Sequence, residues 1–429
     1  MKIHLDLDCY FVSAERTRYP FLKGKKVVVA KSSDKRIFAT TPKTGTLLPN
    51  TGAFNSTLEF QNNYRGDILN LWREHFIDED GSIHGIVITK SYEAKALGIK
   101  TGMPLKEALK LANDLIIIPS DHLFYQEISQ KLKQYLEEKI PIIEQYSIDE
   151  FFGDLSGWIK EKDTYEFLKE LQLDILKKFD LPISIGASPS KWIAKLLTDH
   201  IKPYGIKVLT QKEIKNFTKN IPIEDFPGIG RAIYKRLHRY GIKTLEDLQK
   251  NPLLLSQYGK SGRDLYKRVC GFDNEAVVPN NLRKSIGISR NFPAISSRKE
   301  LKRRVTILAR YLSYTILKFS LNPTLFYFKI KYQGVGSQKL SYRSNRLFNE
   351  RFFIDLAVEK VMELDQMRHL KVHYISLSAS DFIGEGNQKT LSLLEYTNDR
   401  KMYKLQSKLM QIRDKYGIDT ICYGSEKCI

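Results

Sequence analysis

The sequence of 429 residues has few of the features that mark secreted, zinc-binding or membrane proteins. Its four cysteines, Cys9, Cys270, Cys422 and Cys428, are scattered, with no Cys-x-x-Cys pair. They therefore favour neither a disulfide framework nor a zinc site. No apolar run approaches the ~20 residues that a membrane helix needs. Acids interrupt the first residues, which excludes a secretory signal there, so we expect a cytoplasmic protein without a membrane partner.

Acidic residues are also fewer than basic residues. The chain has 49 Asp and Glu against 69 Lys and Arg, a net charge of +20. So large a basic excess points to a polyanionic partner, most often nucleic acid. The segment 283–382 alone has 19 basic and 7 acidic residues, so we expect it to form a nucleic-acid-binding groove.

The hydrophobic periodicity predicts alternating strands and helices. Residues 2–8 alternate, which predicts a strand with Asp6 and Asp8 on one face. A predicted strand over 144–155 has two more acids, Asp149 and Glu150. Helices and strands between and after these segments indicate an α+β fold. Residues 206–275 are predicted to be helical, and 285–380 to be a second α+β region.

The two acidic pairs are candidate metal ligands. Phosphoryl transfer to a hydroxyl commonly uses two divalent ions about 3.5–4 Å apart. Carboxylates from neighbouring strands can hold such ions, because hard cations prefer oxygen ligands. Taken alone, Asp6-Leu7-Asp8 is more simply a turn or a helix cap, and Asp149-Glu150 is surface charge.

Several motifs, in order along the chain, resemble the Y-family translesion DNA polymerases. They are Leu5–Phe11 (LDLDCYF), Thr89–Gly98 (TKSYEAKALG), Ser147–Glu150 (SIDE), Gly186–Lys195 (GASPSKWIAK) and Asp199–Gly205 (DHIKPYG). The agreement covers roughly residues 1–30 and 84–420, and Lys95 together with the tail favours the UmuC-like branch.

The resemblance implies an α+β, multidomain, right-hand polymerase with a ferredoxin-like palm, small fingers, a helical thumb and an α+β little finger. The expected ranges are palm 1–24 and 105–205, fingers 25–104 with an insertion near 42–83, thumb 206–278, little finger 279–383 and tail 384–429. The insertion has no motif. Because it lies between a fingers strand and the expected triphosphate contacts, our hypothesis is that it lids or widens the nascent base-pair site.

The resemblance assigns the metal site to Asp6, Asp149, Glu150 and the carbonyl of Leu7. Two Mg²⁺ ions are the implied cofactors, and Mn²⁺ is expected to be able to replace them. Asp8 would have a supporting role.

The resemblance also implies six residues that contact the deoxynucleoside triphosphate: Tyr10, Phe11, Thr89, Tyr92, Lys95 and Lys191. Phe11 would be the steric gate that excludes a ribose 2′-hydroxyl. Lys191 would meet the β- and γ-phosphates. Lys95 stands where many relatives have arginine, and lysine lacks the guanidinium fork.

Primer-template DNA and a sliding clamp are the implied macromolecular partners. The predicted DNA contacts are Gly228 and Gly230 in a helix-hairpin-helix, Arg283 and Lys284 in the linker, and Arg303 and Arg304. Glycines let a backbone approach phosphate closely. The predicted clamp-binding residues are Gln388, Leu391, Leu393 and Leu394.

The sequence thus predicts a monomeric, low-fidelity DNA polymerase of translesion synthesis, cytoplasmic and associated with the nucleoid. Two alternatives stay open at this point. One is a Y-family-like scaffold that binds DNA or a clamp without catalysis, and the other is a nucleotidyl cyclase with a palm-like sheet. The acids argue against the first, and the helix-hairpin-helix and basic segment argue against the second.

Overall fold

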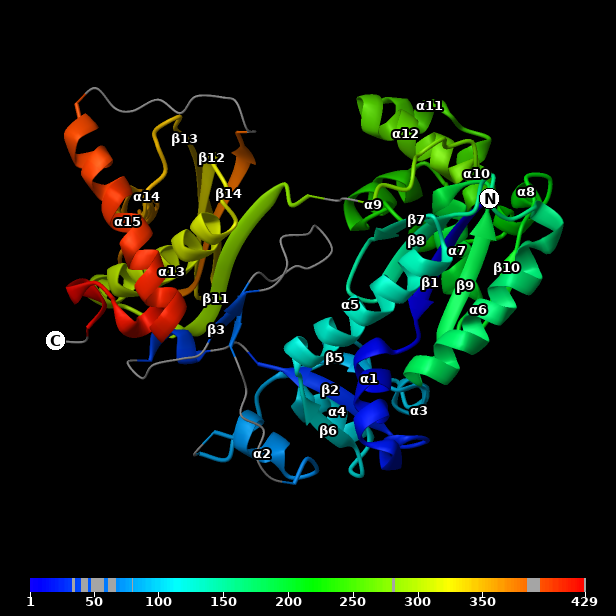
Figure 1. Cartoon of the computed structure of the whole chain (residues 1–429), viewed down its shortest axis with the longest axis horizontal. Helices are drawn as coiled ribbons and strands as arrows, with labels where there is room; N and C mark the ends of the chain where they lie inside the picture. Colours follow the sequence, from blue (N-terminus) through cyan, green and yellow to red (C-terminus); the bar gives the residue numbers. More distant parts are fainter. Residues whose placement is uncertain are drawn as a thin grey trace. The chain divides into compact units, whose positions relative to one another are not determined.

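The computed structural model describes residues 1–32, 35–39, 45–47, 58–60, 67–78, 80–279, 282–383 and 394–427. The chain forms two compact units (Figure 1). Unit 1 contains Met1–Lys31 and Gly66–Asn281, and unit 2 contains Ser32–Arg65 and Leu282–Ile429. No helix among these described residues is long and apolar enough to cross a membrane.

The palm of unit 1 is a five-stranded sheet in the order β10-β9-β1-β8-β7. Its elements are β1 (Lys2–Leu7), α5 (His122–Lys139), β7 (Ile142–Gln145), β8 (Glu150–Asp154), α6 (Thr164–Phe179), β9 (Ile183–Ser188), α7 (Lys191–Ile201) and β10 (Ile206–Val208). Only β9 and β10 pair in parallel. Helix α7 crosses β9 at Gly186, where a Cβ would lie 2.5 Å from the Ala194 carbonyl oxygen. Glycine is therefore required for this close packing.

The fingers are built on the three-stranded sheet β5-β2-β6. Their elements are β2 (Val27–Lys31), α2 (Leu71–Phe76), β5 (Ile86–Lys90), α3 (Tyr92–Ala96), α4 (Leu105–Leu111) and β6 (Ile116–Pro119). Helix α1 (Tyr10–Arg18) precedes them. The fingers continue past the expected end at residue 104, because β6 pairs with β2.

The thumb is a set of short helices around an apolar core that includes Leu237, Leu245 and Val269 and that is shared with helix α7 of the palm. The helices are α8 (Ile214–Thr218), α9 (Arg231–Arg239), α10 (Leu245–Gln249), α11 (Leu253–Ser256) and α12 (Gly259–Val269). Single 3-10 turns occur in unit 1 at Pro20–Leu22, Glu161–Asp163 and Ile223–Asp225.

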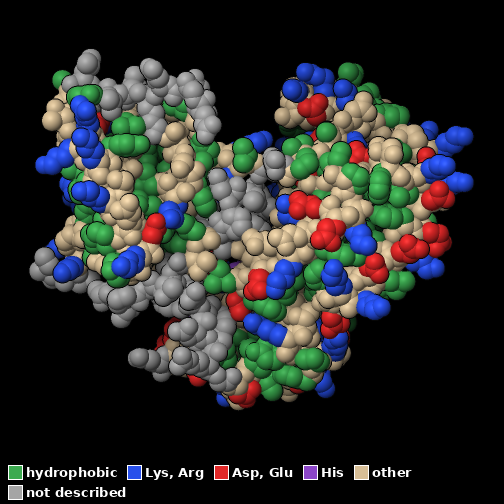
Figure 2. Space-filling model, in the orientation of Figure 1, with side chains coloured by type: hydrophobic (Ala, Val, Ile, Leu, Met, Phe, Trp, Pro, Cys, Tyr) green, Lys and Arg blue, Asp and Glu red, His purple; other side chains and the backbone are tan. Residues whose placement is uncertain are grey.

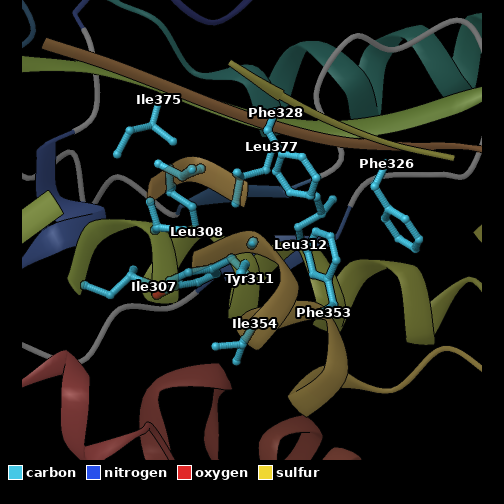
Figure 3. Close-up of a cluster of buried hydrophobic side chains, with 14 of the residues drawn as sticks. Ile307, Leu308, Tyr311, Leu312, Phe326, Phe328, Phe353, Ile354, Ile375 and Leu377 are labelled. Carbon is cyan, nitrogen blue, oxygen red and sulfur yellow. The ribbon is translucent and has the colours of Figure 1, made fainter. Parts of the chain in front are cut away.

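Unit 2 is centred on the antiparallel sheet β11-β14-β12-β13. Its main elements are β11 (Ser285–Ile295), α13 (Arg298–Lys318), β12 (Pro323–Tyr332), β13 (Val335–Arg343), α14 (Glu350–Leu364), β14 (Val372–Phe382) and α15 (Tyr396–Tyr416). Figure 3 shows side chains of α13 and α14 packed against those of β12 and β14. Along β12, Phe326, Phe328 and Ile330 are buried, whereas Tyr327, Lys329 and Lys331 on the other face are partly exposed.

Two predictions about chain organisation differ from the structure. The single strand predicted over 144–155 is a hairpin, because Tyr146 to Asp149 form the turn between β7 and β8. The segment 32–65, called the inserted segment below, belongs to unit 2, whereas we expected it among the fingers. Its described elements are a 3-10 turn (Lys35–Phe38), β3 (Gly45–Leu47) and β4 (Leu58–Phe60).

Candidate active site

The register of the palm sheet brings the predicted carboxylates together. Strands β1 and β8 are antiparallel, with Asp6 directly opposite Glu150. The backbone N–H of Leu7 donates to the Asp149 carbonyl at 3.0 Å, so the hairpin turn is joined to the end of β1. Carboxylate oxygens of Asp6 and Glu150 and a ring nitrogen of His4 all lie within 4.8 Å of one another. Residues separated by more than 140 positions thus form one acidic cluster.

Two lysines neutralise part of this cluster. Lys202 Nζ lies 2.7 Å from Asp6 Oδ2, and Lys195 Nζ lies 2.6 Å from Glu150 Oε2. Burial raises the pKa of Asp6 to about 8, with the charges of Glu150 and Asp149 adding to the effect and Lys202 opposing it. Burial also raises the pKa of Asp149. Burial, rather than repulsion between the carboxylates, is thus the main reason that these two acids hold a proton more tightly than in water.

His4 is a member of the cluster that the sequence did not single out. Its ring is fully buried, and Nε2 lies 3.6 Å from Glu150 Oε2. Burial lowers the pKa of His4 to about 4, so the ring is neutral at pH 7. Burial alone would raise the pKa of Glu150, but His4 and Lys195 outweigh it and lower that pKa. The alternation along β1 places His4 on the same face as Asp6, and this pattern could have identified His4 from the sequence.

The donor set fits divalent cations. Asp6, Asp149 and Glu150 supply carboxylate oxygens, which are the ligands that Mg²⁺ and Mn²⁺ prefer. A carboxyl with a pKa near 8 is partly protonated at neutral pH, and a cation is better placed than a proton to stabilise several neighbouring carboxylates. The residues present therefore fit the implied metal site.

Asp8 does not share the cluster with Asp6, because β1 ends at Leu7 and the chain turns. Its buried carboxylate accepts hydrogen bonds from Tyr92 Oη at 3.1 Å, from Ser184 Oγ at 3.1 Å and from the Tyr204 backbone N–H at 2.7 Å. It thus connects the first turn of α3, strand β9 and the loop that follows Lys202. This geometry agrees with a supporting role.

Tyr10 and Phe11 occupy different environments at the start of α1. Tyr10 is buried, and its hydroxyl donates to the Tyr125 carbonyl. That core position does not agree with the predicted triphosphate contact. The Phe11 ring is partly exposed and stacks on Tyr125, with 4.4 Å between centroids, and meets His122 edge-on. Phe11 is therefore held in place by neighbouring rings, as a steric gate requires.

The structure does not place Lys191 where the resemblance implies, and it places Lys202, for which no role was predicted, at the carboxylates. Lys191 is buried, 2.5 Å from Glu144 Oε2, and its ammonium lies over the Phe152 ring. Glu144 also accepts from the Val278 backbone N–H at 2.7 Å. Lys191 therefore takes part in a buried structural pair, contrary to the predicted phosphate contact, whereas Lys202 lies at the carboxylates. The Lys202-Pro203 pair of the quoted motif was the signal that we missed.

The three predicted fingers contacts lie on β5 and α3. Thr89 is partly buried in β5, opposite Val29. Tyr92 begins α3 and donates to Asp8, and the exposed Lys95 lies with its ammonium 5.7 Å from the centroid of the Tyr92 ring. Their contact with a triphosphate stays a prediction.

The thumb offers the predicted helix-hairpin-helix geometry. Gly228 has a φ of +100°, and Gly230 precedes α9 without a side-chain cap. The first N–H groups of α9 are therefore available to a phosphate. Exposed Lys and Arg side chains gather over α11 and α12 (Figure 2), among them Lys260, Arg263 and Lys267.

Arg303 and Arg304, predicted to bind DNA, have structural contacts instead. Arg303 is 9% exposed and donates to Glu300 and to the carbonyls of Phe38 and Glu426. Arg304 pairs with Glu300 at 2.6 Å, and its guanidinium lies over the Phe38 and Phe292 rings. Donors used in this way are not available to phosphate. In the linker, Arg283 is partly buried and Lys284 is exposed.

Three of the predicted clamp-binding residues, Gln388, Leu391 and Leu393, lie outside the described residues. Leu394 lies within them and is 98% exposed.

Comparisons with known proteins agree with this geometry. A model of the impB/mucB/samB family matches residues 5–199, and one of the thumb domain of DNA polymerase iota matches 224–273. DNA polymerase IV of Oceanobacillus iheyensis is 29% identical over 99% of this chain and 91% of its own length. DNA polymerase IV 1 of Halalkalibacterium halodurans is 32% identical over 73% of this chain and 65% of its own.

Solved structures share the fold. A Y-family DNA polymerase chimera, Dbh-Dpo4(243-245)-Dbh, matches with a TM-score of 0.71 and 23% identity over 89% of this chain and 99% of its own. The match confirms the predicted right-hand α+β fold, and nearness to the UmuC-like branch stays a prediction. The carboxylate register, the family matches and the thumb together establish that the chain belongs to the Y family of DNA polymerases.

Proposed function

We propose that this chain adds deoxynucleotides to a primer 3′-hydroxyl under the direction of a template, as a low-fidelity polymerase of translesion synthesis in DNA damage tolerance. The observation that carries the proposal is the pair of Asp6 and Glu150, which lie together at one end of the palm sheet, with Asp149 in the adjoining turn. Relatives named DNA polymerase IV support it. The intact acids disfavour the scaffold alternative.

The cluster would hold two Mg²⁺ ions through Asp6, Asp149, Glu150 and the Leu7 carbonyl, and these would neutralise charge at the reacting phosphate and lower the pKa of the primer hydroxyl. The chain's own contribution is to fix these oxygens on two paired strands. A rigid donor set costs no reorganisation at the moment of reaction.

Lys202 is our candidate for the contact with the triphosphate. It is partly exposed, and its ammonium already lies 2.7 Å from Asp6. Burial alone would lower the pKa of Lys202, but Asp6 and Asp199 outweigh it and hold the pKa above its ordinary value. The charged ammonium can therefore stabilise the negative charge that develops on the leaving pyrophosphate.

Phe11 is our candidate for sugar selection, since its ring is fixed by the stack on Tyr125. Removing the ring should admit ribonucleotides, and Phe11→Tyr should keep them excluded. Thr89, Tyr92 and Lys95 are proposed to contact the phosphates from the fingers.

DNA is proposed to bind at the start of α9 and on the helix-free face of the unit 2 sheet. There Lys329 lies directly opposite Lys339, and Lys331 lies over the Tyr374 ring. Like charges that face one another across a ladder are unfavourable unless an anion lies between them. The face is therefore suited to the phosphates of a duplex.

The further partners follow from the tail and the relatives. We propose that the region of Gln388 and Leu394 binds a sliding clamp, that the polymerase acts as a monomer, and that it works in the cytoplasm at the nucleoid. The exposure of Leu394 supports the first point.

Primer extension with Mg²⁺ tests the proposed function. The wild type should extend a primer with deoxynucleotides, also opposite damaged template bases, and Asp149→Asn or Glu150→Gln should abolish extension while DNA binding persists. Lys195→Met is a comparison variant. It removes the ammonium beside Glu150 and leaves the three acids in place. Extension by either acid variant, or none by the wild type, would overturn the proposal.

A further inference from the structure

The connection between β2 and β5 is far longer than these strands require. They are antiparallel neighbours, with Val28 opposite Lys90 and Lys31 opposite Ile86. Such neighbours are usually joined by a few residues. Here the chain leaves unit 1 after Lys31, contributes the inserted segment (32–65) to unit 2, and returns at Gly66.

The inserted segment contributes to the core of unit 2. Ile37, Phe38 and Leu58 are 1%, 8% and 7% exposed and belong to the same apolar cluster as α13 and the sheet, and Leu47 packs against that cluster. The Phe38 ring meets Phe292 of β11 edge-on at 5.7 Å. Side chains buried to this extent are closely packed against their neighbours, so the contact is specific.

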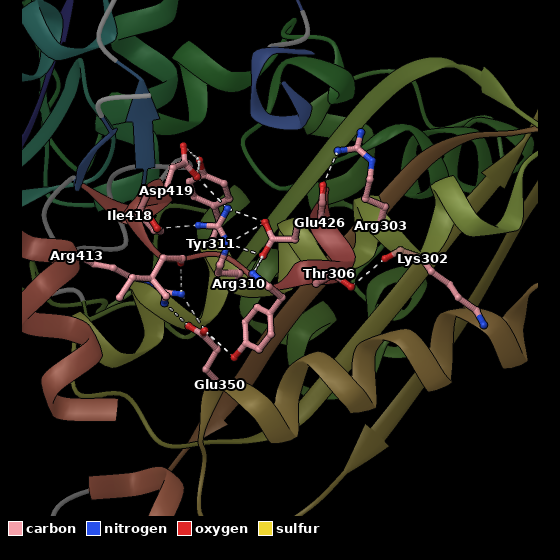
Figure 4. A network of polar contacts seen from close by, with 12 residues as sticks. Lys302, Arg303, Thr306, Arg310, Tyr311, Glu350, Arg413, Ile418, Asp419 and Glu426 are labelled. Carbon is pink, nitrogen blue, oxygen red and sulfur yellow. Dashed lines mark hydrogen bonds and ion pairs between the residues drawn. The ribbon is translucent and has the colours of Figure 1, made fainter. Parts of the chain in front are cut away.

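Polar contacts fix the same segment. Arg303 donates to the Phe38 carbonyl at 3.2 Å and to the Glu426 carbonyl at 3.2 Å, so one guanidinium joins the inserted segment to the C-terminal 3-10 turn (Gly424–Glu426). Figure 4 shows Arg303 beside Glu426 on the same side of α13. Arg304 covers the Phe38 ring at 4.8 Å.

We propose that the inserted segment is an intramolecular strap: a piece of the fingers connection that docks on α13 and β11 and ties unit 2 to the fingers independently of the linker near 279–284. Unit 2 is then joined to unit 1 at both ends of the inserted segment as well as through the linker. The strap limits how far unit 2 can move away from the fingers. This inference does not depend on the reaction that the palm performs.

Cutting the linker tests the strap. A protease recognition sequence is placed between Pro279 and Leu282, and the purified full-length chain is cleaved there under native conditions. The cleaved protein should elute from a sizing column as one species, because the N-terminal fragment keeps the docked strap. If the two fragments separate at micromolar concentration, the proposal is overturned.

Matched variants distinguish docking of the strap from other contacts that could hold the two fragments together. Ile37→Asp places a charge in the unit 2 core and should weaken association of the cleaved fragments at least 100-fold, and Leu58→Asp should act in the same direction. Ala39→Asp adds the same charge at an exposed position and should leave the fragments together. Hydrogen exchange of α13 before cleavage checks that unit 2 is folded. Fragments of folded Ile37→Asp and Leu58→Asp proteins that stay together as tightly as wild type would overturn the proposal.

Discussion

Two buried charge networks among the described residues, one in the palm and one in unit 2, differ in how completely their charged groups are paired. In the palm, three carboxylates meet two lysines, and burial raises the pKa of Asp6 to about 8. In unit 2, Arg310 donates to Glu426, Asp419 and the Ile418 carbonyl at 2.8–3.0 Å (Figure 4). In the palm a carboxyl has a strongly raised pKa, whereas each guanidinium nitrogen of this arginine has an acceptor.

This difference distinguishes a reactive site from a structural one. Arg413 in the same unit donates two bonds to Glu350 and one to the Ile421 carbonyl, although its buried Nε has no hydrogen-bond partner among the described residues. A buried ion whose partners are all present needs no further ligand. A cluster with unbalanced carboxylates is stabilised by a cation that the chain does not supply. A buried carboxyl whose pKa is raised to about 8, in contact with a second carboxylate, therefore marks the palm as the functional centre.

Breaking the unit 2 network should have the largest effect on stability. Arg310→Ala leaves the buried Glu426 and the partly buried Asp419 without their arginine, so we expect a loss of about 3–5 kcal/mol in the unfolding free energy of unit 2. Urea unfolding followed by hydrogen exchange of α13 measures it. The control is Arg343→Ala, whose ion pair with Asp381 is as short but 61% and 50% exposed. We expect less than about 1 kcal/mol there, and equal losses would contradict the comparison.

Lys202 and Lys191 provide the next test, since each pairs with a carboxylate but only Lys202 lies at the unbalanced cluster. Lys202→Ala should slow single-turnover nucleotide addition about 10²–10³-fold, or about 3–4 kcal/mol, with little change in folding. Lys191→Ala should mainly destabilise the palm, because Glu144 stays buried. Rates are compared per folded molecule. A Lys202→Ala enzyme of normal rate would remove the catalytic assignment.

The sequence predicted that the acids share one site, and the register confirms that Asp6 faces Glu150, whereas their metal binding stays a prediction. Alternation on β1 and the SIDE turn place Asp6, Asp149 and Glu150 at strand ends, and the order of the strands determines that these ends meet. The strand predicted over residues 2–8 is observed as β1 (Lys2–Leu7).

The misassigned residues depend on contacts distant in sequence. Lys191 and Lys202 are both basic residues of one motif region, and only the positions of Glu144 and Asp6 distinguish them. Arg303 was predicted to bind DNA because its neighbours are basic, yet the inserted segment and the C-terminal turn take up its donors. No periodicity in residues 32–65 indicates that Ile37 and Phe38 pack in unit 2.

Asp8 tests whether a fully hydrogen-bonded carboxylate beside the cluster has a positioning role. Asp8→Asn replaces an acceptor by a donor that faces the hydroxyls and the Tyr204 N–H. A mismatch of this kind costs about 1–3 kcal/mol, which we expect as a higher KM for the nucleotide with a smaller change in kcat. Ser184→Ala removes only one donor and should have a weaker effect. A change confined to thermal stability would show a purely structural role.

The lysines on the helix-free face of unit 2 should show the smallest effect, and a graded one. Lys329 and Lys339 are directly paired there, so removing either should reduce the slope of log affinity against log salt by about one for primer-template DNA. Lys299→Ala removes the same charge from α13, which packs against the other face, and should leave the slope unchanged. We expect the slope to change only for Lys329 and Lys339, because the described residues place no carboxylate between these two lysines. The buried arginines, in contrast, are neutralised by carboxylates of the same unit. Equal slopes for all three variants would mean that DNA does not follow this face.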